Sequence, residues 1–323
     1  MKFKVVLLKP LHESGIELLC RNACEVSTSS GETEDDFIRD IGDADAVFVR
    51  NEKITSKIMD ACKNLKVIAK HGAGYENIDI DYATSKGIQV VYVPGGNAVA
   101  VAEHTMMMML NCARRLNYVQ REFREGNYNL RFTLSDTHEL YRKTLGIIGV
   151  GNIGKEVARK AAYGFDMKVI AYSEHCTQAQ LDALGVPITL VKSRDIVFSE
   201  SDFVSVHLPA TPKNVGSIGY EEFKKMKSSA YIINTSRGNI IREEEMIEAL
   251  KNGIISGAGL DVFSVEPVCP DNPLLMMENV VVSPHCGGMT VETSKRLSYL
   301  GAQGIVETLY GKSITYPVNH IER

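Results

Sequence analysis

Three polar residues in the second half of the chain are of types that can hold an anion and move a proton. They are Arg237, Glu266 and His285, and each follows shortly after a short apolar run. Where such runs are the strands of an open parallel sheet, their carboxyl ends line the crevice that binds ligands. We therefore expect the three side chains to converge at one site.

These three residue types suit the reduction of a 2-keto acid. Arg237 offers a planar fork of donors for a carboxylate, or for a carbonyl oxygen that gains negative charge as hydride arrives. His285 can supply a proton near neutral pH, and a carboxylate such as Glu266 beside it favours the imidazolium and fixes the ring tautomer. Singly, each residue also suits a surface ion pair, a loop carboxylate or a polar strand end. Their joint occurrence beside a phosphate-binding motif favours catalysis.

That motif is the glycine-rich segment Gly149-Val150-Gly151-Asn152-Ile153-Gly154, which follows the apolar run Leu145–Ile148 and opens a helical pattern at Lys155. In this strand–turn–helix context each glycine has a role. Gly149 permits a tight turn, Gly151 lets the backbone approach a pyrophosphate, and Gly154 lets the helix pack on the strand. The free N–H groups at the helix start, from Asn152 and Ile153 onward, then face the anion. The segment predicts a dinucleotide site.

The residue that meets the adenosine ribose should follow the next apolar run, which ends at Tyr172. An acidic residue about 20 positions beyond the motif is typical of NAD sites. Ser173 stands there instead, and Glu174 follows it. Ser173 does not repel a 2′-phosphate, yet no arginine adjoins it to bind one. Glu174 either binds the ribose or lies in solvent, so NAD is favoured and NADP is not excluded.

Short apolar runs alternate with amphipathic stretches along the whole chain, which is typical of doubly wound parallel sheets. Helical patterns include Glu13–Cys20, Ser56–Cys62 and Ser294–Leu309. The predicted strands are Val5–Leu8, Ala46–Val49, Val67–Ala69, Val90–Val93, Leu145–Val150, Val169–Tyr172, Phe203–His207, Tyr231–Asn234, Gly257–Leu260 and Val280–Ser283. A chain of 323 residues exceeds the ~150 residues of a typical domain, so we expect two domains. The break at Pro94–Asn97, before a long helix over about 98–115, is a plausible crossing between them.

Composition excludes several other classes. The net charge of −4 and the lack of a long Lys/Arg cluster give no reason to expect nucleic acid as a partner. The seven cysteines show no C-x-x-C spacing, so we predict neither a metal site nor a disulfide framework, and a cytoplasmic protein with free thiols. No apolar stretch reaches the ~18 residues of a membrane helix. Met106–Met109 are expected to fill the core or a dimer interface.

Several of these segments together resemble the D-isomer-specific 2-hydroxyacid dehydrogenase family, and the resemblance covers nearly the whole chain. The segments that carry it are Gly149–Gly154, Val204–Pro209, Asn234–Gly238, Leu260–Phe263, Glu266–Pro267 and Ser283–Gly288. It implies a Rossmann dinucleotide-binding domain, here 98–289, and a flavodoxin-like substrate-binding domain made from both chain ends, here 1–97 and 290–323. Family members are usually homodimers.

The resemblance also implies roles for individual residues. Arg237 would clamp the substrate, His285 would transfer the proton and Glu266 would support His285. Asp261 would hydrogen-bond the nicotinamide carboxamide. The remaining positions matched on the cofactor side are His207, Pro209 and Thr235, and His207 equally suits a structural role.

The substrate side is predicted from the first half of the chain. Gly72-Ala73-Gly74 opens a segment that looks like the substrate loop of the family, whose N–H groups meet the substrate carboxylate. Arg50 and Lys70 end two predicted strands, so both could face the substrate. The alternative is that Lys70 is solvated and that Arg50 pairs with an acid such as Glu52. Basic residues in matching segments hold the substrate phosphate in phosphoglycerate dehydrogenases, although a lysine lacks the bidentate fork of arginine.

The sequence therefore predicts an enzyme that transfers a hydride between NAD(P)H and a small 2-keto acid, most similar to phosphoglycerate dehydrogenases. Glyoxylate or hydroxypyruvate reductase is the alternative within the family. A nucleotide-sensing regulatory protein on the same scaffold is the alternative from another class.

Overall fold

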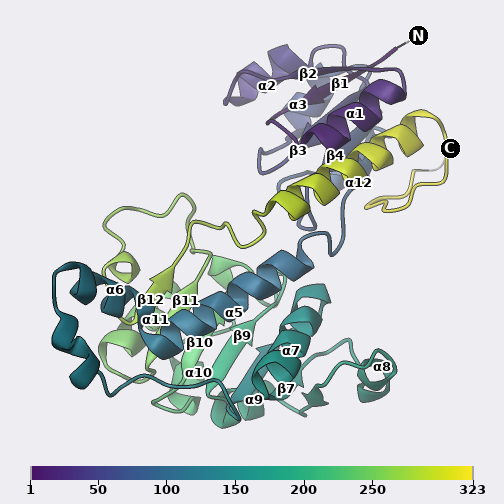
Figure 1. The fold of residues 1–323 in the computed structure, drawn as a ribbon. Helices are drawn as coiled ribbons and strands as arrows, with labels where there is room; N and C mark the ends of the chain where they lie inside the picture. Colours follow the sequence, from purple (N-terminus) through teal and green to yellow (C-terminus); the bar gives the residue numbers. More distant parts are fainter. Residues whose placement is uncertain (1, 322–323) are drawn as a thin grey trace. The chain divides into compact units, whose positions relative to one another are not determined.

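The computed structural model describes residues 2–321, and the chain divides into two compact units (Figure 1). The first unit takes in the chain up to Asn97 and again from Met289, and the second unit is Ala98–Gly288. Each unit is built around one parallel sheet. None of the helices among residues 2–321 combines the length and the apolar character that a membrane span requires.

The sheet of the first unit has five strands in the order β2-β1-β3-β4-β5, all parallel. They are β1 (Phe3–Leu7), β2 (Cys24–Thr28), β3 (Ala46–Val49), β4 (Val67–Lys70) and β5 (Gln89–Val91). β3 and β4 are buried along their whole length, as expected for strands covered on both faces. The order 2-1-3-4-5 is that of flavodoxin-like folds.

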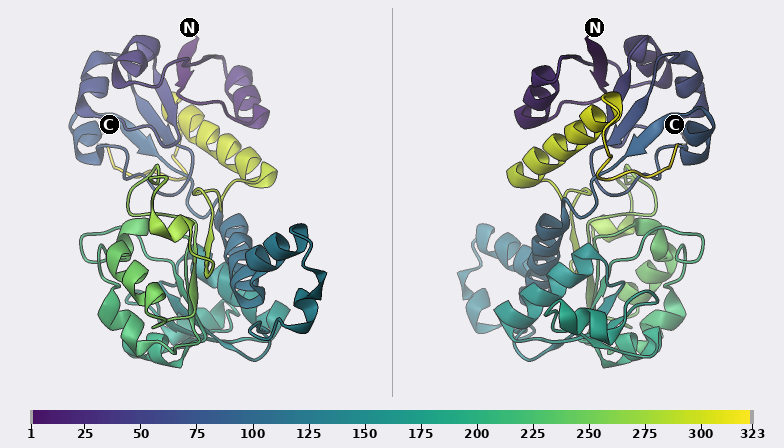
Figure 2. Two further views of the ribbon diagram at one scale, coloured as in Figure 1. Left: turned by 90° about the vertical axis from the view of Figure 1, so that its left-hand side faces the viewer. Right: turned by 90° about the vertical axis from the view of Figure 1, so that its right-hand side faces the viewer.

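Five helices cover the two faces of this sheet. They are α1 (Glu13–Arg21), α2 (Glu34–Ile41), α3 (Ser56–Ala61), α4 (Ile80–Ser85) and α12 (Val291–Leu309). The apolar side chains of α2, α3 and α4 share one core with the sheet, and those of α1 and α12 share the core on its other face. Figure 2 shows α12 lying along this unit, although it comes from the far end of the sequence.

Small residues let α12 approach its neighbours closely. A Cβ atom on Gly15 of α1 would lie 2.6 Å from the carbonyl oxygen of Ser298, and one on Gly301 would lie 2.2 Å from the ring of Phe48. The Oγ atom of Ser298 also accepts a hydrogen bond from the N–H of His12 at 3.1 Å. Beyond α12 the buried side chain of Asn319 accepts from the N–H of Val90 at 2.7 Å, so the tail completes the β5 edge.

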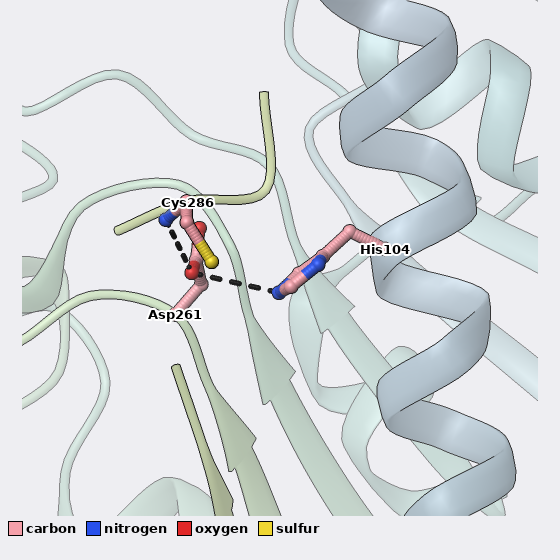
Figure 3. Close-up of side chains that lie close together, drawn as sticks. All are labelled: His104, Asp261 and Cys286. Atoms are coloured by element: carbon pink, nitrogen blue, oxygen red, sulfur yellow. Dashed lines mark hydrogen bonds and ion pairs between the residues drawn. The ribbon is translucent and has the colours of Figure 1, made fainter. Parts of the chain in front are cut away.

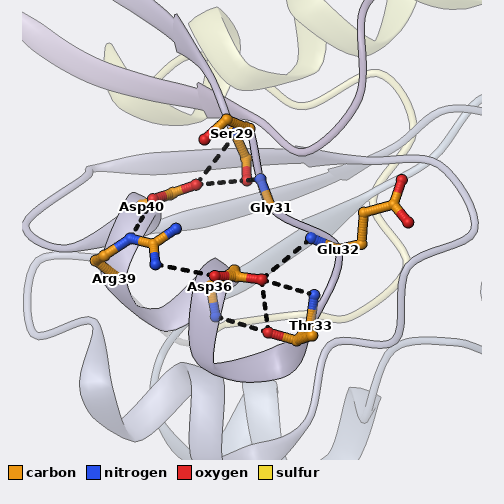
Figure 4. A network of polar contacts seen from close by, with 8 residues as sticks. Ser29, Gly31, Glu32, Thr33, Asp36, Arg39 and Asp40 are labelled. Atoms are coloured by element: carbon orange, nitrogen blue, oxygen red, sulfur yellow. Dashed lines mark hydrogen bonds and ion pairs between the residues drawn. The ribbon is translucent and has the colours of Figure 1, made fainter.

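A polar network holds the start of α2 (Figure 4). The Oγ1 atom of Thr33 accepts from the N–H of Asp36 at 3.2 Å, and the Asp36 carboxylate accepts from the N–H of Thr33 at 3.2 Å. This reciprocal pair is a capping box. Hydrogen bonds from Thr33 and from Arg39 lower the pKa of the Asp36 carboxyl to about 2. The loop between β2 and α2 is thereby fixed by its own side chains.

The sheet of the second unit has seven parallel strands in the order β12-β11-β10-β9-β6-β7-β8. They are β6 (Thr144–Ile148), β7 (Lys168–Tyr172), β8 (Thr189–Leu190), β9 (Phe203–Val206), β10 (Tyr231–Asn234), β11 (Gly257–Leu260) and β12 (Val280–Val282). Numbered within the unit, β8 to β11 read 3-2-1-4-5-6, which is the order of the Rossmann fold. β12 adds a seventh strand at the edge. The order reverses between β6 and β9, where such folds bind their ligands.

Helices again cover both faces. They are α5 (Ala98–Arg114), α6 (Leu116–Arg124), α7 (Asn152–Phe165), α8 (Gln178–Ala183), α9 (Arg194–Glu200), α10 (Tyr220–Lys225) and α11 (Glu243–Lys251), with short 3₁₀ turns at Tyr128–Phe132, Gly238–Ile240 and Pro273–Leu275. α5, α7 and α8 share one core with the sheet, and α9, α10 and α11 share the other. Three of the four consecutive methionines of α5 are buried, whereas Met107 is 47% exposed.

The sequence predicts most of these elements to within a few residues and misses two strands. Both missed strands, β2 and β8, lie at the outer edges of their sheets. β2 is only partly buried and β8 has two residues. Neither therefore shows the continuous apolar run that marks a central parallel strand.

Candidate functional site

His285 and Glu266 form a direct pair in the second unit. The Nδ1 atom of His285 lies 2.7 Å from Oε2 of Glu266. The other carboxylate oxygen of Glu266 accepts from the N–H of Phe263 at 3.1 Å, which fixes the carboxylate. His285 has a positive φ of 50° and is half exposed, so its ring stands out from the turn after β12. Because Nδ1 contacts Glu266, Nε2 is the ring nitrogen that is available to a substrate.

A buried carboxylate organises the turn that carries His285. Asp261 is only 2% exposed, and its two oxygens accept from the N–H groups of Cys286 at 2.9 Å and of Gly287 at 2.8 Å. Its main-chain carbonyl accepts from the N–H of His285 at 2.7 Å. Asp261 therefore holds both sides of the turn in place.

His104 of α5 reaches the same carboxylate directly (Figure 3), and it also reaches it through the hydroxyl of Ser283. Its Nε2 atom lies 2.9 Å from Oγ of Ser283 and 3.5 Å from Oδ1 of Asp261, and Ser283 donates to Oδ1 at 2.5 Å. Burial opposes ionisation of Asp261, but hydrogen bonds from His104, Ser283 and the two backbone N–H groups outweigh it and lower its pKa. Asp261 is therefore a charged anchor at neutral pH.

His104 and Asp261, together with Cys286, are residue types that bind transition metals. Atoms of His104, Asp261 and Cys286 lie within 4.8 Å of one another (Figure 3). The carboxylate already accepts hydrogen bonds on both oxygens. The absence of a metal site thus stays a prediction.

Arg237 lies in the loop between β10 and the 3₁₀ turn Gly238–Ile240. The Asn234 side chain fixes this loop, because its Oδ1 accepts from the N–H of Ser236 at 3.0 Å and its Nδ2 donates to the carbonyl of Arg237 at 3.0 Å. The guanidinium of Arg237 donates to the carbonyl of Ser236 at 2.8 Å. Thr235 is buried, and its hydroxyl lies 3.0 Å from that of Thr105.

Close packing joins the Arg237 loop to the Glu266 loop. A Cβ atom on Gly238 would lie 1.9 Å from the carbonyl carbon of Phe263, so only glycine fits there. Phe263 in turn donates its N–H to Glu266. The structure thus brings the loops of Arg237, Glu266 and His285 to the carboxyl ends of β10, β11 and β12, as the sequence predicts.

The glycine motif forms the turn between β6 and α7. Gly149 has a φ of +99°, and a Cβ atom there would lie 2.5 Å from the carbonyl oxygen of His207. A Cβ atom on Gly154 would lie 2.4 Å from the carbonyl oxygen of Gly149, whereas the space beside Gly151 is open. α7 starts at Asn152 with no side chain capping it. Its first N–H groups, including those of Asn152 and Ile153, are therefore available to an anion.

A cavity of about 300 Å³ adjoins this turn. Its lining includes Gly149, Gly151, Ser173, His207 and Pro209. The ring of His207 bonds through Nε2 to Oγ of Ser205 at 2.8 Å, while its buried Nδ1 has no partner among the described residues. Burial lowers the pKa of His207 to about 4, so the ring is neutral at pH 7. An open backbone turn and an unmatched polar atom fit a dinucleotide cofactor.

Glu174 is turned toward a lysine. Its carboxylate lies 2.6 Å from Nζ of Lys213, and hydrogen bonds from Lys213 lower the pKa of Glu174. Both side chains line the cavity, and Glu174 is 40% exposed. The carboxylate is thus neither buried in the cavity nor isolated in solvent.

The predicted substrate residues belong to the first unit, at the carboxyl ends of β3 and β4. Lys70 is 6% exposed, and its ammonium donates to the carbonyl of Arg50. The interpretation of Lys70 as a solvated lysine is therefore wrong. Arg50 meets Glu52 through its backbone N–H at 2.8 Å. The sequence placed both residues at strand ends but gave no sign that the ammonium would be buried against the main chain.

The segment after β4 presents unused donors. Gly72 has a φ of +135° with open space around it, and its carbonyl accepts from the N–H of Val93 at 2.9 Å. Within residues 2–321, the N–H groups of Ala73 and Gly74 donate to no other residue. Two adjacent free N–H groups suit a small carboxylate.

The sequence assigns no role to three residues of the second unit that lie at the site. His104 and Ser283 contact Asp261, and Arg194 lines the cavity beside Ser173. Each comes from a segment distant in sequence from the residue it meets. No spacing rule connects them, because only the sheet topology brings them together.

A parallel sheet in Rossmann order with a glycine turn at its switch point defines a dinucleotide-binding protein. Residues 106–287 match the family model described as D-isomer specific 2-hydroxyacid dehydrogenase, NAD binding domain. The chain belongs to the D-isomer specific 2-hydroxyacid dehydrogenase family, and the cofactor of its binding domain is NAD.

Curated relatives carry three names within this family. The chain is 36% identical to the D-3-phosphoglycerate dehydrogenase of Archaeoglobus fulgidus over 98% of its own length and 59% of that protein. It is 39% identical to the hydroxypyruvate reductase of Thermotoga maritima, with 92% and 95% of the two chains covered. It is 34% identical to the glyoxylate reductase of Thermofilum pendens, with 96% and 92% covered. The chain thus spans less than two thirds of its phosphoglycerate dehydrogenase relative and almost all of the two reductases.

The fold is also that of solved family structures. The NAD⁺-bound 3-phosphoglycerate dehydrogenase of Entamoeba histolytica matches with a TM-score of 0.83 and 30% identity, and the match covers 100% of each chain. This agreement confirms the predicted pairing of a Rossmann and a flavodoxin-like domain.

Proposed function

We propose that this chain reduces small 2-keto acids to 2-hydroxy acids, and catalyses the reverse oxidation, with NAD(H). The observation that carries the proposal is the His285–Glu266 pair at 2.7 Å, held beside the Arg237 loop at the carboxyl edge of a dinucleotide-binding sheet. The second unit would be the dinucleotide-binding domain and the first the substrate-binding domain.

In this mechanism the bound cofactor supplies the hydride, and the protein handles charge and the proton. The guanidinium of Arg237 holds the carboxylate and the carbonyl oxygen of the substrate, and stabilises the negative charge that develops on that oxygen. Nε2 of His285 donates the proton to it. Glu266 accepts a hydrogen bond from Nδ1 and so orients the ring with Nε2 toward the substrate.

The other predicted residues have positioning roles. Asp261 holds the turn that carries His285, and it would also meet the nicotinamide carboxamide. Thr235, His207 and Pro209 would line the cofactor site. On the substrate side, the N–H groups of Ala73 and Gly74, after Gly72, would bind the substrate carboxylate.

Arg50 and Lys70 favour a substrate with a polar or anionic tail. Both are cations at the carboxyl ends of neighbouring strands, and the Lys70 ammonium lies against the Arg50 carbonyl. A phosphate or hydroxyl group would add acceptors for their donors. The substrate most consistent with this pair is phosphohydroxypyruvate, with hydroxypyruvate or glyoxylate as the second candidate because the chain spans nearly the full length of those two reductases.

We expect wild type to prefer phosphohydroxypyruvate, hydroxypyruvate or glyoxylate to the branched apolar acid 2-ketoisocaproate, with NADH as the reductant. In Arg50→Ala the value of kcat/KM should fall for the anionic-tailed substrate more than for glyoxylate. The measurement is initial-rate kinetics for the four acids. Lys53→Ala, which removes a nearby exposed cation, is the matched control.

If wild type prefers 2-ketoisocaproate, or if the order of kcat/KM among the four acids is unchanged in Arg50→Ala, then Arg50 and Lys70 do not bind the tail of the substrate. Binding of NADH without turnover of any 2-keto acid would instead favour a nucleotide-sensing regulatory protein.

A homodimer is the assembly that the apolar surface of the second unit supports. α6 (Leu116–Arg124) has no buried residue, and it lies beside α5 at one edge of this unit in Figure 1. Large apolar side chains of this unit are exposed between α5 and α7: Met107, Leu110, Leu116, Phe123, Tyr128, Phe132, Tyr141 and Tyr163. Met107, Leu110, Leu116 and Tyr163 line one hollow, and exposed apolar side chains gathered in this way mark an interaction site.

We expect light scattering on a sizing column to give twice the mass of one chain for wild type and a lower mass for Phe132→Glu. Phe132 is 72% exposed, so the charge should disturb an interface without disturbing the fold. Val291→Glu is the control, because Val291 is 73% exposed but belongs to the first unit. A monomeric wild type, or an unchanged dimer in Phe132→Glu, would contradict this assignment.

A further inference from the structure

We propose that the cavity beside Ser173 contains a subsite for a phosphate monoester, with Arg194 as its principal cation, and that the protein therefore binds NADP(H) as well as NAD(H). The phosphate is the one on the 2′-oxygen of the adenosine ribose. The inference rests on the proposed function for the place of the cofactor, and it adds a specificity that NAD binding alone does not require.

The first observation is the environment of Arg194. This residue is the first of α9, and its half-buried guanidinium lines the cavity that also contains Ser173. Among the described residues, its guanidinium makes one hydrogen bond, from Nη2 to Oγ of Ser217 at 3.3 Å. The Nε–H group is buried and has no partner among residues 2–321, and in that part of the chain no carboxylate oxygen lies within 4.0 Å of the guanidinium.

Such a cation is costly unless an anion meets it. Removing a charged group from water without a partner destabilises the folded state. Burial is the main influence on the pKa of Arg194, which it lowers, and the more distant Glu222 opposes that effect. A guanidinium stays charged in proteins all the same. An unmatched donor and an unpaired charge at the same point of a cavity are what a phosphate oxygen would satisfy.

The second observation is the residue at the end of β7. NAD-specific sites place an acidic residue there, which binds the ribose hydroxyls and repels a 2′-phosphate. In this chain the position is Ser173, whose hydroxyl accepts from the N–H of His175 at 3.3 Å. A hydroxyl carries no charge and can donate to a phosphate oxygen. Ser173 therefore leaves room for the group that an aspartate would exclude.

The charges that line the cavity support the same conclusion. Glu174 is the one acidic residue in its lining, and Lys213 is paired with it at 2.6 Å. Arg194 is thus the cation left unbalanced, with His175 as a further nitrogen donor. Bound NAD would leave the positive charge of Arg194 without a partner, whereas the 2′-phosphate of NADP would neutralise it. Glu174 lines the same cavity and can also accept from the ribose hydroxyls of NAD(H), so we expect both cofactors to be used, with less than about a hundredfold discrimination between them.

Calorimetric titration with two nucleotide fragments tests the subsite without turnover. Adenosine 2′,5′-bisphosphate carries the 2′-phosphate, and adenosine 5′-monophosphate lacks it. We expect wild type to bind the bisphosphate at least tenfold more tightly. Arg194→Ala should lose that advantage, Arg194→Lys should keep part of it because charge without the fork binds phosphate less well, and 5′-monophosphate binding should be unchanged in both. Arg159→Ala, which removes a half-buried arginine on α7 that is paired with Glu156, is the control.

Steady-state kinetics give a second reading. The ratio of kcat/KM for NADPH to that for NADH should fall at least tenfold in Arg194→Ala and stay constant in Arg159→Ala. If Arg194→Ala fails to fold, the phosphate subsite is still tested by Arg194→Gln and by the affinities of wild type for the two nucleotides.

Equal affinity of wild type for the two nucleotides, or an undiminished advantage in the Arg194 variants, would overturn the phosphate subsite while leaving the proposed function intact. Failure of both nucleotides to bind would count against the cofactor site itself, and so against the proposed function as well.

Discussion

Arg237→Ala should lower kcat/KM for the preferred keto acid by about 10²–10³-fold, because it removes the donors aimed at the oxygen that becomes negative. The affinity for NADH should stay within about twofold, since we assign Arg237 to the substrate alone. Stopped-flow or steady-state absorbance of NADH gives the rate, and fluorescence titration gives the affinity. Arg237→Lys should recover only part of the rate, because an ammonium lacks the planar fork.

The control for this variant is Lys251→Ala, which removes an exposed positive charge at the end of α11 in the same unit. Its kinetics should match wild type. Activity of Arg237→Ala within tenfold of wild type would remove Arg237 from the catalytic site. A loss of NADH affinity equal to the loss of rate would instead move Arg237 to the cofactor side.

His285→Asn should lower the rate of keto-acid reduction by roughly 10²–10⁴-fold, the usual contribution of a general acid. Asparagine is the replacement of choice because His285 has a φ of +50°, a conformation that asparagine tolerates better than most residues. The variant should therefore fold with the turn intact and bind NADH normally. Single-turnover kinetics with saturating cofactor measure the proton-coupled step directly.

Glu266→Gln separates positioning from proton transfer. Glutamine can still accept a hydrogen bond from Nδ1 but brings no charge, so the variant should lose less activity than His285→Asn. In the His285→Asn background the same change should have little further effect, because coupled residues are not additive. Independent, additive losses would show that the 2.7 Å contact is structural.

The sequence predicts the place of Arg237 and His285 in the fold, because both residues lie just past strand ends. Arg237 follows the fully buried strand β10 and His285 follows the apolar strand β12, and topology places such strand ends at one edge. Buried central strands such as β10 (Tyr231–Asn234) and β11 (Gly257–Leu260) are predicted with their observed bounds, since nothing but an apolar run can occupy them.

What the sequence could not predict depends on side chains that meet across the fold. His104 of α5 contacts Asp261, just after β11, and Arg194 of α9 lines the same cavity as Ser173, just after β7. Lys70 was expected in solvent under one interpretation, yet its ammonium bonds a carbonyl of the neighbouring strand. Periodicity describes which face of an element is apolar, and it carries no information on which polar groups of distant elements come together.

The return of the chain to its first unit has a consequence for synthesis on the ribosome. The N-terminal strands emerge first, but the helix that covers Phe48, Ala69 and Val91 is α12, which follows the entire second unit. The apolar side chains on one face of that sheet therefore remain exposed to solvent while the second unit is translated and folds as a continuous segment. Nascent chains in this condition are prone to associate with one another. In a circular permutant that begins at Ala98 and joins residue 323 to residue 1 through a short linker, α12 would be synthesised before the strands that it covers.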